Sequence, residues 1–215
     1  MRSILARISI FSAMILASAA PAHAGLLMYL DADKPDFVAA LDPGYFAIDE
    51  VGPPGAFGTP LTYSQGPGRF GISISANNYA IYRHNNIIHT FGIYDTLTIR
   101  FDRSTSAFGA GFGSTTDGGA LTGNYAYIFA KSKSGAVLDR YARLGEFVGF
   151  IATPGDELDY VQVIKADGDL GRYSAIVPRI YVGTAFSVPE PSTLALAGIG
   201  AVVATARFAR RNRAV

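Results

Sequence analysis

Residues 96–101 read Thr-Leu-Thr-Ile-Arg-Phe, and residues 107–112 read Ala-Phe-Gly-Ala-Gly-Phe. In both stretches apolar side chains recur at every second position, which places them on one face of an extended chain. The residues on these faces are Leu97, Ile99, Phe101, Phe108, Ala110 and Phe112. A period of two is typical of a half-buried β-strand, so we expect two strands here with their apolar faces in a core.

Short runs of β-forming residues continue outward from these strands and are separated by clusters of glycine and proline. The later runs are Tyr125–Phe129, Val137-Leu138, Phe147–Ile151, Leu158–Ile164 and Tyr173–Val182. The clusters are Gly52-Pro53-Pro54-Gly55, Gly66-Pro67-Gly68, Gly118-Gly119 and Pro154-Gly155. Between the two ends of the chain, Lys34 to Leu41 fits one or two turns of helix. This pattern predicts an all-β fold, a single β-sandwich or jelly roll.

The N-terminus has the three parts of an export signal. Arg2 and Arg7 precede an apolar run, residues 8–20, and Ala22 and Ala24 provide small residues before Gly25. We therefore expect residues 1–24 to be a signal peptide, used by the Sec translocon and cut by signal peptidase after Ala24. A membrane anchor is the alternative, but the run is shorter than the roughly 20 residues that a bilayer span needs.

The C-terminus has a different three-part pattern. Val188-Pro189-Glu190-Pro191 comes first, an apolar run from Leu194 to Ala206 follows, and four arginines close the segment: Arg207, Arg210, Arg211 and Arg213. The two prolines hold the first part in an extended form, which a protease can bind. We expect a short transmembrane helix over about residues 192–208, with the arginines of 207–213 retained on the cytoplasmic side.

The Pro-Glu-Pro tripeptide, the apolar run and the arginines follow one another in an order that closely resembles the PEP-CTERM signal of Gram-negative bacteria. This signal is also catalogued as the C-terminal domain of an ice-binding protein. The resemblance covers residues 188–215. It implies export, transient holding in the inner membrane, and cleavage near Pro-Glu-Pro by an exosortase, with the product at the cell surface or outside the cell. It also implies association with exopolysaccharide. The alternative is a tail anchor that is never cut.

Composition limits what residues 25–187 can do. Two of the 18 basic residues lie in the signal peptide and four in the tail, and Glu190 is one of the 17 acidic residues, which leaves 12 basic against 16 acidic residues. A net charge of −4 argues against nucleic acid as a partner. The chain has no cysteine, which excludes thiol nucleophiles and cysteine-ligated metals. The length suits one exported domain.

A second, looser resemblance covers about 90 residues, from Leu97 to Gly183. The order of strands and of Phe-Gly-Ala-Gly-Phe and Phe-Val-Gly-Phe motifs is similar to the β-sandwich cargo domain common among PEP-CTERM proteins and to galactose-binding-like modules. That pattern often has an aspartate pair before its last strand. Here Val177-Pro178 stands there instead, so no metal or ligand role is transferred to this position.

Catalytic patterns are weak, and we predict that the protein is not an enzyme. Ser114 lies in a glycine-rich stretch that lacks the Gly-x-Ser-x-Gly pattern, and His84 and His89 have no third metal ligand nearby. A secreted carbohydrate-active enzyme is the alternative, because two facing carboxylates would be enough for glycoside hydrolysis. The candidate carboxylates lie close together in the sequence: Glu146, Asp156, Glu157 and Asp159.

A calcium site is the one cofactor that the residues suggest. Asp167-Gly168-Asp169 begins like an acidic metal loop but lacks the later ligands of an EF-hand. Asp-Gly is also the commonest signal of a hairpin turn. We expect no cofactor, and calcium at Asp167 and Asp169 is the alternative.

The surface most suggestive of a ligand lies in residues 77–86. Amides, an arginine and tyrosines can donate hydrogen bonds to hydroxyls and stack on the apolar face of a sugar. The candidate glycan-binding residues are Asn78, Tyr79, Tyr82, Arg83 and Asn85. Asparagine pairs are also turn formers, and alternation along a strand would send neighbouring side chains to opposite faces.

Together these patterns predict an exported, exosortase-sorted surface or extracellular-matrix protein with a non-enzymatic β-sandwich, associated with exopolysaccharide. Two other functions stay open. One is a secreted carbohydrate-active enzyme, and the other is a purely structural or membrane-anchored envelope protein.

Overall fold

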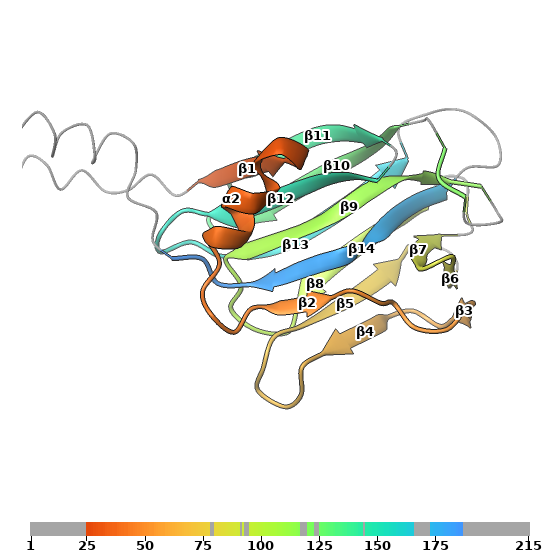
Figure 1. The fold of residues 1–215 in the computed structure, drawn as a ribbon, viewed down its shortest axis with the longest axis horizontal. Helices are drawn as coiled ribbons and strands as arrows, with labels where there is room; N and C mark the ends of the chain where they lie inside the picture. Colours follow the sequence, from red (N-terminus) through yellow and green to blue (C-terminus); the bar gives the residue numbers. More distant parts are fainter. Residues whose placement is uncertain are drawn as a thin grey trace, which may run out of the picture.

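The computed structural model describes residues 25–77, 80–90, 92, 95–116, 120–122, 125–143, 145–165 and 173–186. Two antiparallel sheets face each other (Figure 1), which confirms the all-β sandwich. Along the larger sheet the strands follow the order β1 (Leu26–Leu30), β12 (Glu146–Ala152), β9 (Ala107–Thr115), β14 (Tyr173–Gly183), β7 (Ile87–Thr90), β6 (Ile81–His84) and β3 (Gly55–Phe57), and β2 (Phe46–Ile48) also pairs with β14.

The smaller sheet forms the other layer of the sandwich. Its strands follow the order β11 (Val137–Arg143), β10 (Tyr125–Ser132), β13 (Leu158–Lys165), β8 (Thr96–Phe101), β5 (Gly71–Ala76) and β4 (Leu61–Ser64). Because β10 and β11 are joined by a tight turn through Gly135, whose φ is +95°, they form a hairpin at the edge of this sheet.

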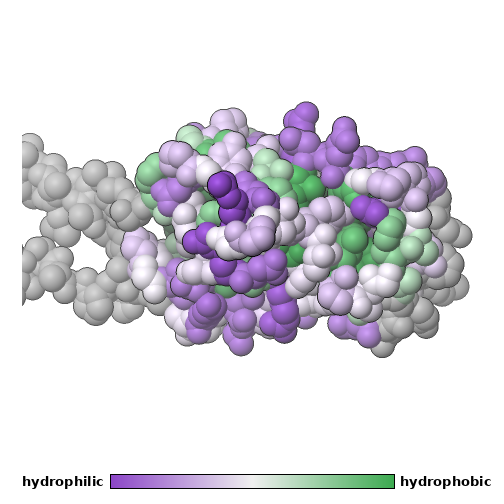
Figure 2. All heavy atoms as spheres, turned by 90° about the horizontal axis from the view of Figure 1, so that it is seen from below, coloured by the Kyte–Doolittle hydropathy of each residue, from purple (hydrophilic) through white to green (hydrophobic). Residues whose placement is uncertain are grey.

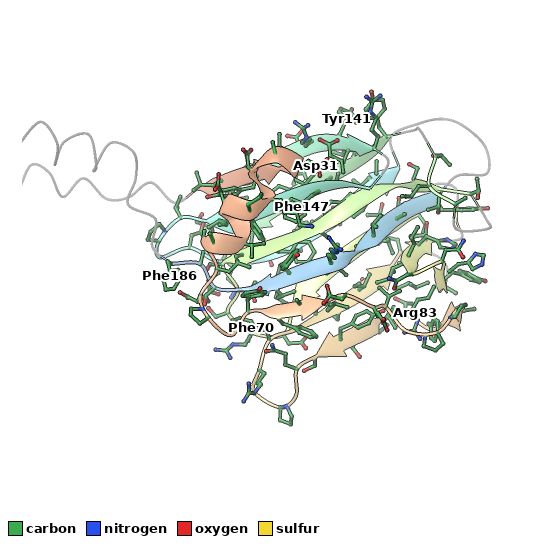
Figure 3. All side chains as sticks on the ribbon, viewed as in Figure 1. Asp31, Phe70, Arg83, Tyr141, Phe147 and Phe186 are labelled. Atoms are coloured by element: carbon green, nitrogen blue, oxygen red, sulfur yellow. The ribbon has the colours of Figure 1, made fainter. Side chains whose placement is uncertain are left out.

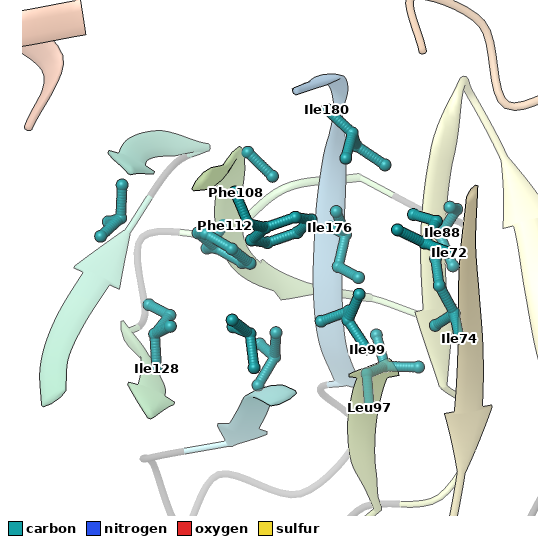
Figure 4. Packing of buried hydrophobic residues seen from close by; sticks show 14 of the residues in the cluster. Ile72, Ile74, Ile88, Leu97, Ile99, Phe108, Phe112, Ile128, Ile176 and Ile180 are labelled. Carbon is teal, nitrogen blue, oxygen red and sulfur yellow. The ribbon is translucent and has the colours of Figure 1, made fainter. Parts of the chain in front are cut away.

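The core lies between the sheets. Leu97 and Ile99 of β8 are fully buried and face Phe108 and Phe112 of β9 across the sandwich (Figure 4). Both strands predicted from residues 96–101 and 107–112 are therefore confirmed, with the expected faces in the core. Burial of apolar surface of this kind stabilises the fold by about 25 cal/mol per Å².

A short helical segment covers part of the outer face of the larger sheet (Figure 1). It consists of the 3-10 turn η1 (Asp31–Asp33) and helix α2 (Lys34–Ala39), which confirms the helix expected near Lys34. Pro35 suits the first turn of α2, where no backbone amide hydrogen is needed. The buried ring of Phe37 packs against Phe147 and Ile151 of β12. Strand β12 is therefore apolar on both faces, which explains its continuous apolar run.

The first and last described residues are held at the same end of the sandwich. The Gly25 amide donates to Thr153 Oγ1 at 2.8 Å, and the Ala185 amide donates to Ser106 Oγ at 3.0 Å. These two acceptors are neighbours, because the Ala152 amide donates to the Ser106 carbonyl at 2.7 Å. The beginning and the end of the described domain therefore lie next to each other.

Both sorting segments lie outside the described residues. They contain Ala22 and Ala24, the motif at 188–191, the expected helix at about 192–208, and the arginines at 207, 210, 211 and 213. Among the described residues, no helix is both long and apolar enough to cross a membrane.

Candidate functional site

The outer face of the smaller sheet carries a group of aromatic side chains. Along β10 the even-numbered residues Ala126, Ile128 and Ala130 are fully buried in the core. Period-two alternation therefore turns the odd-numbered residues outward, among them Tyr125 and Tyr127. We call the outward rings of β10, β11 and β13 the aromatic face, which consists of Tyr125, Tyr127, Phe129, Tyr141 and Tyr160.

The register of the strands brings these rings together. Tyr127 lies directly opposite Tyr141, with ring centroids 5.1 Å apart, and Tyr125 meets Tyr141 edge-on at 6.3 Å. On the other side of β10, Phe129 stacks on Tyr160 with centroids 6.0 Å apart and ring planes 25° apart. Such aromatic pairs each contribute about 0.5–1.5 kcal/mol beyond the area they bury. The rings therefore support one another in a fixed arrangement.

This aromatic group is open to solvent. The exposed fraction is 40% for Tyr125 and 56% for Tyr141, and the other three rings are half-buried. Figure 3 shows Tyr141 projecting from the margin of the molecule, away from the helical segment. Large exposed apolar groups are unfavourable in water, and contiguous ones usually mark a binding surface.

Polar groups lie among the rings. The Asp139 carboxylate accepts a hydrogen bond from the Tyr127 hydroxyl, which raises the pKa of Tyr127 above its usual value. The Gln162 amide donates to Thr98 Oγ1 at 3.2 Å, in the same cross-strand row as Phe129. The face thus combines ring surfaces with carboxylate, amide and hydroxyl groups.

Three cations lie over the rings. The Arg143 guanidinium is 5.6 Å from the Tyr125 centroid, and Lys131 Nζ is 5.9 Å from the Tyr160 centroid. Arg100 lies 5.6 Å from the same Tyr160 ring. Cation–π contacts at such distances hold the charged groups at the surface of the rings.

The remaining outer face of this sheet is lined by small hydroxyl side chains from β4, β5 and β8. They are Thr62, Ser64, Ser73, Ser75, Thr96 and Thr98. Ser75 lies opposite Thr98, but both threonines of β8 are buried among their neighbours. This half of the sheet therefore offers no regular row of exposed threonines.

The two candidate glycan residues of strand β6 do not share a surface. Tyr82 stacks on His89 of β7, with centroids 5.9 Å apart. Arg83, the next residue along the strand, points to the opposite side, where its guanidinium lies 3.6 Å from the Phe57 ring centroid and donates to the Val51 carbonyl. The structure thus separates two side chains that the hypothesis placed together.

The asparagines of this segment form the turn between β6 and β7. Asn85 and Asn86 have φ of 49° and 59°, as a two-residue hairpin turn of type I′ requires. The Asn86 side chain also accepts a hydrogen bond from the Val51 amide at 3.0 Å. Asn78 and Tyr79 lie outside the described residues, so the glycan site predicted at residues 78–85 stays a prediction.

The carboxylates considered for catalysis are each held by their own partner. Glu146 pairs with Arg140 at 2.6 Å, Glu157 with Lys133 at 2.5 Å, and Asp159 with Arg100 at 4.0 Å. Asp156 accepts hydrogen bonds from the amide and the hydroxyl of Ser134. Burial raises the pKa of Asp156, but the hydrogen bonds from the Ser134 and Ser132 hydroxyls and from the Glu157 and Ser134 amides together outweigh burial and lower it overall.

A metal site is not formed by the residues that the structure describes, since these contain no group of three or more histidine, aspartate or glutamate side chains that could hold an ion. Asp167 and Asp169 lie outside the described residues, and calcium there stays a prediction.

Apolar side chains are also visible along the lower edge of the sandwich, between polar ones (Figure 2). Partly buried residues from β2, β4 and the turn after β4 pack there against the core: Phe46, Leu61, Tyr63 and Phe70. The Tyr63 hydroxyl donates to the Val51 carbonyl at 3.0 Å. This edge is therefore an extension of the core, whereas the aromatic face stands apart from it.

The sequence analysis predicts a strand at Tyr125–Phe129 but not the side of the sheet on which Tyr125, Tyr127 and Phe129 lie. The signal was present, because Lys131 continues the same alternation and a lysine marks the side that faces water. When small residues alternate with aromatic residues along a strand and a lysine follows in the aromatic positions, the pattern predicts that the aromatic side chains lie on the outer face.

The comparisons with known proteins concern the tail and the sandwich separately. Residues 187–213 match the model of the PEP-CTERM protein-sorting motif, which confirms the predicted C-terminal signal. The motif implies an exported protein that is recognised by an exosortase. No curated protein matches the chain in sequence. Among solved structures, the family 11 carbohydrate-binding module of a cellulosomal cellulase of Clostridium thermocellum is similar, with a TM-score of 0.28 and 11% identity over 66% of this chain and 95% of that one. A TM-score this low supports no conclusion about ligand or ancestry.

Proposed function

We propose that this chain, which carries the PEP-CTERM sorting motif, is a surface or extracellular-matrix protein whose non-enzymatic sandwich binds polysaccharide through the aromatic face. In this proposal residues 1–24 are removed on export by signal peptidase. Residues 25–187 form the exported domain, and residues 188–215 are the sorting signal that an exosortase cuts. The polysaccharide is the exopolysaccharide among which the sorted product is placed.

The orientation of β10 is the observation that carries the binding part of the proposal. This strand buries Ala126 and Ala130 and turns Tyr125 and Tyr127 outward, although the larger side chains would gain more free energy from burial. A fold under selection for stability alone has little reason to place five rings on an outer face. A ligand that covers the rings supplies that reason.

The chemistry of the face suits a sugar chain. Flat rings pack against the apolar C–H faces of pyranose sugars, and tyrosine hydroxyls at their edges can donate and accept hydrogen bonds. Asp139 and Gln162, both next to Phe129 in its cross-strand row, add an acceptor and an amide within the face. Binding on an open sheet face needs no cleft, so a long polymer can lie across it.

The partners of the carboxylates support binding over catalysis. A glycosidase needs two carboxyl groups free to act on the same bond. Here Glu146 and Glu157 are neutralised by different cations in different parts of the fold, and Asp156 clamps a turn.

The binding proposal is tested with the mature protein, secreted by a host that contains an exosortase, in affinity electrophoresis through gels that contain the host's exopolysaccharide. We expect Tyr141→Ala to weaken binding about tenfold, from the loss of about 1.4 kcal/mol of ring contact. Phe186→Ala is the matched control, because Phe186 is an equally exposed aromatic residue outside the face, with an exposed fraction of 53%. Equal retardation of the two variants and the wild type would reject the aromatic face as the site.

The sorting proposal needs a separate measurement, the intact mass of the protein from envelope and medium, with and without Glu190→Ala. We expect the wild type to lose residues 1–24 and the segment after about residue 187. The variant should keep its tail. A tail that persists in both proteins would make the chain a membrane-anchored envelope protein and would remove the link to exopolysaccharide.

A further inference from the structure

The aromatic face has a charge opposite in sign to that of the domain that carries it. Residues 25–187 contain 12 basic and 16 acidic residues. The outward side chains of the aromatic strands and of the neighbouring β8 include three cations and two carboxylates: Lys131, Arg143, Arg100, Asp139 and Asp159. The local excess is therefore positive on a domain that is negative overall.

Among the residues that the structure describes, two of these cations have no charged partner. Arg100 is paired with Asp159, and Asp139 accepts the hydrogen bond of Tyr127. Within the part of the chain that the structure describes, neither Lys131 nor Arg143 lies within 4.0 Å of a carboxylate, and both lie over rings instead. Their charges remain available to a ligand.

These two cations lie at opposite ends of the row of rings. Arg143 is paired across the hairpin with Tyr125, and Lys131 is six residues further along β10, opposite Val137. At about 3.4 Å per residue, the two positions are roughly 20 Å apart along the strand. Tyr127 and Phe129 lie between them on the same side of β10. A polymer that follows β10 therefore passes a cation, a series of rings and a second cation.

We infer that the polysaccharide bound by the aromatic face carries carboxylate groups, as uronic acids do, and that Lys131 and Arg143 pair with them. The inference rests on the function proposed above and names the class of its ligand. A neutral glycan could accept hydrogen bonds from these two cations but would form no ion pair with them. An acidic glycan would be repelled by the rest of an acidic domain, and so would be directed to this face. The planar guanidinium of Arg143 also suits the two oxygens of a carboxylate.

The test uses mature protein and exopolysaccharide from the medium of a bacterium that makes it, separated by anion exchange into acidic and neutral fractions. A portion of the acidic fraction is converted by chemical reduction of its carboxyl groups to alcohols. This provides the same polymer without the charge. Binding is measured by affinity electrophoresis against all three preparations at low and high salt.

We expect binding to the acidic fraction to weaken at least tenfold on carboxyl reduction and to fall with rising salt. Lys131→Gln with Arg143→Gln should cause a similar loss for the acidic polymer and leave binding to the reduced polymer unchanged. Arg69→Gln with Arg103→Gln is the control, since it removes the same charge from outside the face. Tyr141→Ala should weaken binding to both polymers.

The outcomes separate this inference from the function on which it rests. Equal binding of acidic and reduced polymer, lost in Tyr141→Ala, would overturn the acidic ligand and keep the polysaccharide site. An equal loss in the control pair would make the effect one of overall charge and would also overturn it. If no preparation binds, or if the protein instead pairs with a second copy or with lipid vesicles through Tyr141, both proposals fail.

Discussion

The ring of Phe37 lies against the backbone of Gly149, so closely that a Cβ atom at position 149 would stand 2.6 Å from Phe37 Cδ2. Gly149 is paired with Gly109 of β9, where a Cβ atom would stand 3.0 Å from Phe37 Cε1. Tyr29 and Tyr181 flank the two glycines in the same cross-strand row. The paired glycines thus form a recess that receives the helix residue and fixes helix α2 on the larger sheet.

We expect Gly149→Ala to destabilise the domain by about 1–3 kcal/mol, because the added methyl group overpacks a buried ring. Chemical unfolding in urea measures the change. Gly58→Ala is the control, since position 58 has open space around it and should change stability little. Combined with Phe37→Ala, the cost of Gly149→Ala should shrink. A full cost in that background would mean that Phe37 is not the obstacle.

Arg140 and Glu146 join the two sheets, because Arg140 belongs to β11 and Glu146 to β12. Glu146→Gln should cost about 1–2 kcal/mol, since it leaves a half-buried guanidinium without its counter-charge. Asp159→Asn breaks the exposed Arg100 pair and should cost less than about 0.5 kcal/mol. Urea unfolding of both variants checks the prediction, and equal costs would show that the pair between the sheets is no stronger than a surface pair.

Asp156 makes part of the stability depend on pH. Although burial raises its pKa, hydrogen bonds from Ser134, Ser132 and the Glu157 amide together lower the pKa overall in the folded state. Its stabilisation is therefore complete above the usual carboxyl pKa of about 4 and is lost as the pH falls through the lower folded value. At pH 7, Asp156→Asn should cost about 1–3 kcal/mol through the lost charged hydrogen bonds.

Thermal melts between pH 3 and pH 7 should therefore show the wild type and Asp156→Asn converging toward acid pH. Asp49→Asn, at an exposed position, serves as the control and should run parallel to the wild type. A gap between Asp156→Asn and the wild type that does not change with pH would contradict an ionised Asp156 as its source.

Asp139 raises the pKa of the Tyr127 phenol mainly through its hydrogen bond and also through its negative charge, and partial desolvation adds to the rise. Asp139→Asn should lower the pKa of Tyr127 toward the ordinary value of about 10. Titration of tyrosine ring carbons by NMR measures the shift, with Tyr127→Phe to assign the signal. An unmoved pKa in Asp139→Asn would mean that this hydrogen bond does not form in solution.

The layers of the fold were predictable because each strand keeps its own alternation. The alternation predicted four core residues, and all four are buried in the core: Leu97, Ile99, Phe108 and Phe112. Helix α2 was predictable as a short turn but not as a cover for the sheet. That role depends on Gly109 and Gly149, which come together only through pairing of β9 with β12.

The candidate site was less predictable, because it depends on which side of a strand faces water and on contacts between distant strands. Tyr125, Tyr127 and Tyr141 become neighbours through the register of a hairpin, and their outward orientation is decided by the alanines behind them. Tyr82 and Arg83 illustrate the opposite case. They are adjacent in sequence, and their strand places them on opposite sides.

The two strands next to the chain ends, β1 and β14, lie at the same end of the domain but differ in how many strands they pair with. Within the described residues β1 is an edge strand paired with β12 alone, whereas β14 is paired with β9 on one side and with β7 and β2 on the other. Mechanical force applied through the C-terminal end therefore acts on a strand that is paired with three others, β9, β7 and β2. Force applied through the N-terminal end would peel β1 away first. A domain held at its C-terminal end while a polymer pulls on it is therefore loaded through an interior strand of the sheet and not through an edge strand.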